Sequence, residues 1–143
     1  MKAIAFVFAL TFGFGFTFAR TLSFAAETDD AFELVRGAAP PLRAGQKATV
    51  SLSIVPRGGY RLLDGGPVLV RLTAGGGARP EHALLRRDDA VDPRADVPRF
   101  ELVFVAEHAG AAHLDAACTF YVCKSARCRP IETHATWQLT VAP

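Results

Sequence analysis

Residues 47–54 read KATVSLSI, and polar and apolar side chains alternate at every position of this stretch. Successive side chains of a β-strand point to opposite faces of the sheet, so strict alternation is typical of a strand with one buried face. The Pro-Arg-Gly-Gly sequence at 56–59 then favours a turn that ends the strand. The stretch therefore predicts a half-buried strand whose apolar face consists of Ala48, Val50, Leu52 and Ile54.

Other short segments with alternating apolar residues follow along the chain, and turn-forming residues separate them. No segment has the 3.6-residue period of an amphipathic helix. About seven short strands separated by turns are typical of an all-β protein, and we predict an immunoglobulin-like antiparallel β-sandwich. Besides 47–54, the predicted strands lie at 60–63, 68–73, 82–85, 100–104, 114–122 and 136–141.

Two regions do not fit the strand pattern. Residues 27–46 contain Pro40, Pro41 and Gly45 and are expected to form an irregular lead-in, with a short helix at 30–36. Residues 86–99 hold two prolines and many charges, which predicts a long surface loop.

The first 25 residues are typical of a secretory signal peptide. A positive charge near the start precedes an apolar run at 3–19, and small residues favour cleavage after Ala25, or alternatively after Ala19. The run is also at the lower limit for a membrane-spanning helix, so a retained anchor is the alternative. We therefore predict a signal peptide at 1–25 and one β-sandwich domain at 26–143.

Charge excludes some classes of partner. Without the predicted signal peptide the chain has 14 basic and 14 acidic residues, so its formal net charge is zero. There is no basic stripe with interleaved aromatic residues, and we predict no nucleic-acid partner. No cofactor motif or small-molecule substrate is evident. Export predicts a periplasmic or secreted protein of a bacterial envelope, where disulfides persist.

The chain has three cysteines, so at least one cannot pair within it. Cys118 and Cys123 lie in one predicted strand, roughly 16 Å apart and on opposite faces. A disulfide needs much closer Cα atoms, so these two cannot bond. Cys118 lies on the apolar face and is expected to be a buried, inert thiol.

Cys123 and Cys128 are separated by four residues, a common length for a hairpin loop. A hairpin here places the two cysteines opposite each other and aligns the apolar faces of its strands, which supports this register. Cys123 then lies on the face away from the core, and the disulfide is expected to be accessible at one end of the sandwich. The other pairs of this register are Val122 with Arg129, Phe120 with Ile131, Leu114 with Trp137, and Cys118 with Thr133.

The residues leave three uses of this pair open. As a structural staple it closes a small loop, which contributes about 2 kcal/mol in the chain-entropy model. As an exchangeable disulfide it would react more readily because of Lys124, Arg127 and Arg129, since nearby positive charge favours the thiolate. As a metal site the two cysteines with His134 offer soft ligands for Cu(I) or Zn²⁺.

The segment FYVCKSARCRP at 120–130, on the next-to-last strand of a predicted sandwich, resembles the N-terminal periplasmic domain of the transmembrane thiol:disulfide interchange proteins of the DsbD type. That domain is immunoglobulin-like, and its cysteine pair relays reducing equivalents without a dissociable cofactor. The resemblance implies that Cys123 and Cys128 are the redox-active pair. It also implies that Cys128 forms the mixed disulfide with partners and that Cys123 resolves it.

The resemblance further implies thioredoxin-like partner proteins and, because this sequence stops at Pro143, a membrane-bound electron donor in another chain. The family has a longer proline-containing stretch after the second cysteine, where this chain has Pro130 alone. Family members cover the disulfide with an aromatic loop flanked by acidic residues, for which Tyr60 and Asp88-Asp89 are the candidates here. On charge alone Asp88-Asp89 is expected to be a solvated cluster.

The sequence therefore predicts an exported thiol–disulfide exchange domain, a component of a protein-disulfide reductase system. The alternatives are an envelope binding or structural module with a purely structural disulfide, and a periplasmic copper-binding domain.

Overall fold

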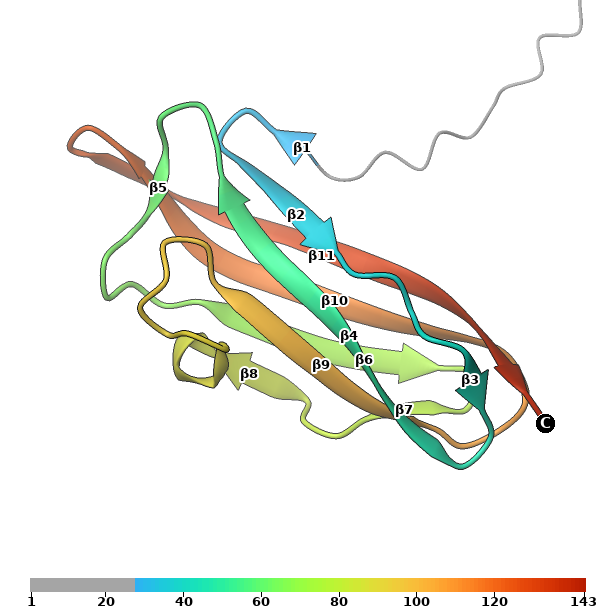
Figure 1. Ribbon diagram of the computed structural model, residues 1–143. Coiled ribbons are helices and arrows are strands. Elements are labelled where there is room, and N and C mark those ends of the chain that lie inside the picture. Colours follow the sequence, from blue (N-terminus) through green and yellow to red (C-terminus); the bar gives the residue numbers. More distant parts are fainter. Residues whose placement is uncertain (1–27) are drawn as a thin grey trace, which may run out of the picture.

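The computed structural model describes residues 28–143, so the predicted signal peptide lies outside the described residues. They form two β-sheets packed face to face, which confirms the predicted all-β sandwich (Figure 1). The first sheet has the order β1 (Thr28–Asp29), β2 (Phe32–Arg36), β4 (Gln46–Pro56), β9 (Arg99–Ala106) and β7 (Ala78–Pro80). The second has the order β3 (Leu42–Arg43), β11 (Arg127–Ala142), β10 (Gly110–Lys124), β6 (Leu69–Gly75) and β8 (Leu84–Arg86), and β5 (Arg61–Leu62) also pairs with β10.

The core lies between the sheets, where the alternating apolar faces of both meet. Val50, Leu52 and Ile54 of β4 are buried, as their alternation predicts. The rings of Phe32 and Phe120 come from opposite sheets and meet edge to face, with 5.3 Å between their centroids. Such pairs stabilise a core by more than their buried area alone.

All seven predicted strands are present, and four more occur in residues 28–143: β1, β2, β3 and β7. The predicted helix at 30–36 is wrong, because β2 covers most of this range and pairs along β4. Phe32 and Leu34 of β2 are buried while Val35 is exposed, which is the two-residue period of a strand. The irregular lead-in predicted at 27–46 shrinks to the segment 37–41 between β2 and β3.

The loop predicted at 86–99 is confirmed in the main. It contains a single 3-10 turn, Arg87–Asp89. The backbone N–H of Arg86, just before this turn, donates to the Asp89 carboxylate at 2.7 Å. The predicted strand at 82–85 is shifted to Leu84–Arg86. Within residues 28–143, no helix has the length and apolar character needed to cross a membrane.

The long hairpin of β10 and β11 carries both cysteines of the predicted site, and its observed register is the predicted one. Strand β6 pairs with β10 only as far as Thr119, so the hairpin runs on past the end of β6. The loop is shorter than predicted, because Lys124 and Arg127 still pair and only Ser125 and Ala126 form the turn. Ser125 has a φ of 56°, in the left-handed region that two-residue hairpin turns require.

Candidate functional site

The candidate site is the hairpin tip, which we define as residues 123–129. Its disulfide joins Cys123 of β10 to Cys128 of β11, as the register predicts, with 4.0 Å between the Cα atoms. The two cysteines face each other directly across the strand pair. The antiparallel pairing of two long strands places their turn at one end of the molecule (Figure 1). The disulfide lies one residue pair away from the pair that closes this turn.

The two sulfur-bearing residues differ in exposure. Cys123 is 2% exposed, whereas Cys128 is exposed to solvent. The prediction of an accessible pair is therefore wrong for Cys123 and right for Cys128. The reason is that β5 pairs with β10 at this height, with Arg61 opposite Cys123, so β10 is flanked on both sides.

On the other side of the hairpin, β11 has an open edge beside Cys128. Within residues 28–143, β3 pairs with β11 only at Val141 and Ala142. The Ala142 carbonyl accepts a hydrogen bond from Ala44 across this edge at 2.9 Å. Backbone direction alternates along an antiparallel strand, and Cys128 lies an even number of residues from Ala142, so its N–H and C=O also point outward. A partner can therefore approach Cys128 from the side as well as from the end.

Part of this edge is protected against pairing with other strands. Pro130 has no backbone N–H to offer, and proline is tolerated on the solvent side of an edge strand. The Arg36 side chain donates to the backbone carbonyl of Thr136. Pro130 and Arg36 thus interrupt the edge between Cys128 and the short pairing with β3.

Three cations are close to the cysteines in the sequence of the tip. Lys124, Arg127 and Arg129 are all exposed. The Nζ of Lys124 lies 5.3 Å, and the guanidinium carbon of Arg129 5.7 Å, from the centroid of the Tyr60 ring. These distances permit cation–π attraction. The tip therefore carries its positive charge on side chains that are partly ordered by an aromatic ring.

Tyr60, one of the residues considered for covering the disulfide, does lie at the tip. It packs against Lys124 and Arg129, which neighbour the cysteines in sequence and so point to the opposite face of the hairpin. A pocket of about 660 Å³ opens here, lined by Tyr60 and by residues 124–129. Tyr60 therefore supports the tip from the face away from the disulfide.

Arg129 is tied to the first sheet. Its Nη2 donates to Oδ1 of Asp29 at 2.8 Å. The pKa of Asp29 lies below its usual value, first because the backbone N–H of Ala31 donates to the carboxylate and then because Arg129 does. The same ion pair raises the pKa of Arg129. Asp29 thus neutralises one of the three cations of the tip and leaves Lys124 and Arg127.

The other acidic candidate, Asp88-Asp89, does not cover the disulfide. Both residues are exposed on the 3-10 turn, and Asp89 accepts the backbone N–H of Arg86. The pair is a solvated cluster that closes its own turn, as its charge alone predicts.

Cys118 is the free cysteine among the described residues, and it is buried at 1% exposure. It faces the core opposite Thr133 of β11. Burial raises the pKa of its thiol to about 12. The prediction of a buried cysteine is confirmed, and this pKa leaves very little thiolate at neutral pH.

The structure does not bring His134 to the cysteine pair. His134 lies six residues along β11 from Cys128, a distance of about 20 Å in an extended strand. Among residues 28–143, no group of three or more His, Cys, Asp or Glu side chains is placed to hold a metal ion. The metal site considered for Cys123, Cys128 and His134 is therefore wrong.

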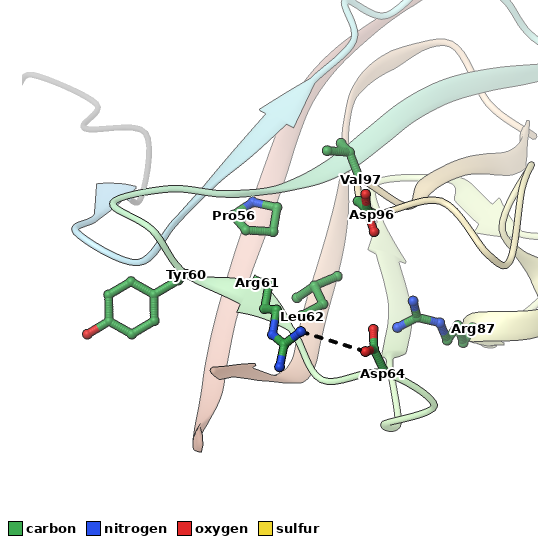
Figure 2. A pocket seen from close by; sticks show the side chains of 8 residues that line it. All are labelled: Pro56, Tyr60, Arg61, Leu62, Asp64, Arg87, Asp96 and Val97. Atoms are coloured by element: carbon green, nitrogen blue, oxygen red, sulfur yellow. Dashed lines mark ion pairs between the residues drawn. The ribbon is translucent and has the colours of Figure 1, made fainter. Parts of the chain in front are cut away.

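A second pocket of about 500 Å³ lies beside β5 (Figure 2). Figure 2 shows Arg61 and Asp64 facing each other at this pocket, with 3.9 Å between the guanidinium and carboxylate atoms. Arg87 donates through Nε to the Pro93 carbonyl at 3.1 Å, and its Nη1 is buried without a hydrogen-bond partner in residues 28–143. The charges around this pocket balance. Its lining residues are Pro56, Tyr60, Arg61, Leu62, Asp64, Arg87, Asp96 and Val97.

Comparison with known proteins gives the fold and no family. No protein family model and no curated protein match the sequence. The cohesin module of a family 33 glycoside hydrolase from Clostridium perfringens is similar in structure, with a TM-score of 0.50 at 6% identity over 80% of this chain and 98% of that one. AggA, the major subunit of aggregative adherence fimbriae type I from Escherichia coli, aligns with a TM-score of 0.40 at 14% identity over 80% of this chain and 97% of that one.

At such low identity a likeness to solved structures extends to the fold alone. The likeness to thiol:disulfide interchange proteins rests on residues 120–130 of the sequence and stays a prediction. The chain is a two-sheet β-sandwich similar to that of the cohesin module, with a disulfide at the tip of its longest hairpin.

Proposed function

We propose that this chain is an exported thiol–disulfide exchange domain that acts through Cys128 and Cys123. The observation that carries the proposal is the unequal exposure of the two cysteines, because exchange requires that one sulfur can be reached by a partner. Its partners would be thioredoxin-like proteins and a membrane-bound electron donor, in the periplasm or outside the cell.

The exchange begins when a partner thiolate attacks the Sγ of Cys128. A mixed disulfide forms and Cys123 leaves as the thiolate. A second thiol of the partner then attacks the partner's own sulfur in the mixed disulfide and releases Cys128. The partner dithiol is oxidised to a disulfide and the cysteine pair is reduced by two electrons. In the reverse direction Cys128 attacks a partner disulfide and Cys123 resolves the intermediate.

The position of the pair is compatible with repeated opening. Cys123 is buried, yet it does not belong to the cluster of apolar residues that forms the core. The bond that opens therefore joins no two members of that cluster. A disulfide that closes so short a loop also adds little to folding in the chain-entropy model, about 2 kcal/mol.

The nearby cations support the chemistry. Lys124 and Arg127 lie between the two cysteines in the sequence, and positive charge near a thiol stabilises its thiolate. A thiol with a lowered pKa is a better leaving group and is more fully ionised at neutral pH.

A second candidate is an envelope binding module that uses the disulfide as a staple. Two observations favour it: Ser125 adopts a left-handed conformation next to the pair, and a cohesin module has a similar fold. A non-glycine residue at positive φ costs free energy, so a cross-link beside it would hold the turn in shape.

The reduction potential of the pair separates the two candidates. The purified domain is equilibrated in defined thiol–disulfide buffers and alkylated, and the adducts are mapped by mass spectrometry, with Cys118 as internal control. An exchange domain titrates above about −300 mV with an unchanged circular dichroism spectrum. A pair that resists reduction until the chain unfolds is a staple, and the exchange proposal then fails.

A further inference from the structure

The charge of the tip points to the chemistry of the partner. Residues 123–129 contain three cations and no acidic residue, whereas the rest of residues 28–143 contains 11 basic and 13 acidic residues. The tip is therefore net positive, whereas the remainder of the domain is net negative by two charges. Such an asymmetry orients an approaching charged protein before contact.

Two of the three cations of the tip have no acidic partner within residues 28–143, although the Lys124 ammonium lies over the Tyr60 ring. Lys124 and Arg127 have no ion pair within residues 28–143, and both side chains are exposed on either side of the turn. Arg129 is paired with Asp29, so the net charge that the tip presents comes from the other two. Arg61 lies opposite Cys123 on β5, but Asp64 balances its charge at 3.9 Å.

These cations lie one residue along the strands from the disulfide, on the opposite face of the hairpin. Lys124 is adjacent in sequence to Cys123, and Arg127 to Cys128. A partner that brings its own sulfur to Cys128 must therefore place its surface within the range of these charges, because the Debye length is about 10 Å at 0.1 M salt.

We infer that the hairpin tip selects a redox partner whose reactive cysteine is surrounded by carboxylates, through Lys124 and Arg127. The inference rests on the proposed exchange function and adds the charge of the partner to it. A partner with a basic surface would be repelled at the same distance. The exchange itself is the balanced dithiol–disulfide transfer described above.

The test uses two synthetic peptides of equal length, each with one cysteine, flanked by aspartates in one and by lysines in the other. The rate constant for their attack on the Cys123–Cys128 disulfide is divided by each peptide's rate with a small neutral disulfide, because the flanking charges also alter the peptide thiol. Dithiothreitol, which is neutral, measures the intrinsic reactivity of the pair.

For the native domain at low salt, the acidic peptide is expected to react about tenfold faster than the basic one, a preference that is lost at 0.5 M salt. The double variant Lys124→Gln, Arg127→Gln is expected to lose the preference after normalisation to dithiothreitol. The matched control Arg43→Gln, Arg99→Gln removes two exposed cations from other strands and should keep it.

Equal rates for the two peptides, with normal reduction by dithiothreitol, overturn the inference and leave the exchange function standing. A preference that survives the double variant also overturns it, because other charges would then be responsible. Failure of dithiothreitol to reduce the folded domain overturns the exchange function, and the inference falls with it.

Discussion

Arg129 and Asp29 form an ion pair with 2.8 Å between Nη2 and Oδ1, although 100 residues separate them in sequence. The pair joins the hairpin tip of the second sheet to β1 of the first. The carboxylate also accepts the backbone N–H of Ala31 at 3.0 Å, which closes the turn between β1 and β2. One aspartate thus shapes a turn of one sheet and anchors the tip of the other.

The anchor predicts a pH dependence at the tip. The pKa of Asp29 is lowered in the folded state, so the pair is present above the unfolded value of 3.8 and is lost as the pH falls through the lower folded value. A carboxyl NMR titration should show Asp29 ionising below 3.8. As the pH falls through this midpoint, the Lys124 amide should lose protection, that is, exchange faster relative to its intrinsic rate at the same pH. Asp29→Asn should show the faster exchange already at neutral pH, and unchanged exchange in that variant would contradict the anchor.

Glycine substitutions at the two residues of the hairpin turn are expected to change the free energy of unfolding in opposite directions. Ser125→Gly is expected to raise the free energy of unfolding by up to about 1 kcal/mol, because glycine adopts positive φ without steric cost. Ala126→Gly is the matched control and should lower it by a similar amount, since Ala126 is not at positive φ and glycine only adds entropy to the unfolded chain. Urea denaturation measures both, and equal effects would refute the assignment of the strain to Ser125.

The burial of Cys118 predicts an unreactive thiol. A pKa of about 12 in place of 9.0 leaves about a thousandfold less thiolate at pH 8, so alkylation by iodoacetamide should slow by at least this factor until the chain is unfolded. The same raised pKa means that the contribution of Cys118 to stability is present below pH 9 and is lost as the pH rises towards 12. Cys118→Ala should remove this loss. Unfolding curves of the native and variant proteins at pH 8 and at pH 10.5 measure it. Rapid alkylation of the native domain would contradict the burial.

A hydrogen bond from Trp137 of β11 links the second sheet to the segment that follows β2 of the first sheet. The indole Nε1 of Trp137 donates to the carbonyl of Gly37 at 2.8 Å, and the tryptophan is buried. Trp137→Phe keeps an aromatic ring in the core and removes the donor to this half-buried carbonyl, so the free energy of unfolding should fall by about 0.5–1.5 kcal/mol. Thermal and urea unfolding of the oxidised protein measure the loss. A variant as stable as the native protein would mean that water replaces the indole at Gly37.

The strands of the core and the register of the cysteine hairpin could be predicted because their pattern is local. Alternation in β4 requires a buried face, and a slip of one residue between β10 and β11 would turn Phe120 and Ile131 away from the core. Pairing Cys123 with Cys128 follows from that register. β2 was predicted as a helix because its alternating stretch is only five residues long, and its pairing with β4 decides its conformation.

The sequence by itself therefore determined the β-sandwich, the burial of Cys118 and the pairing of Cys123 with Cys128, because two-residue periodicity and apolar burial act on neighbouring residues. Only the tertiary structure decided which of the paired cysteines is exposed. Strand β5 covers one side of the tip and the edge of β11 stays open on the other, and both depend on contacts between residues far apart in the chain. The same is true of Tyr60 and Asp29, which reach the tip from other strands and turns and carry no local signal of doing so.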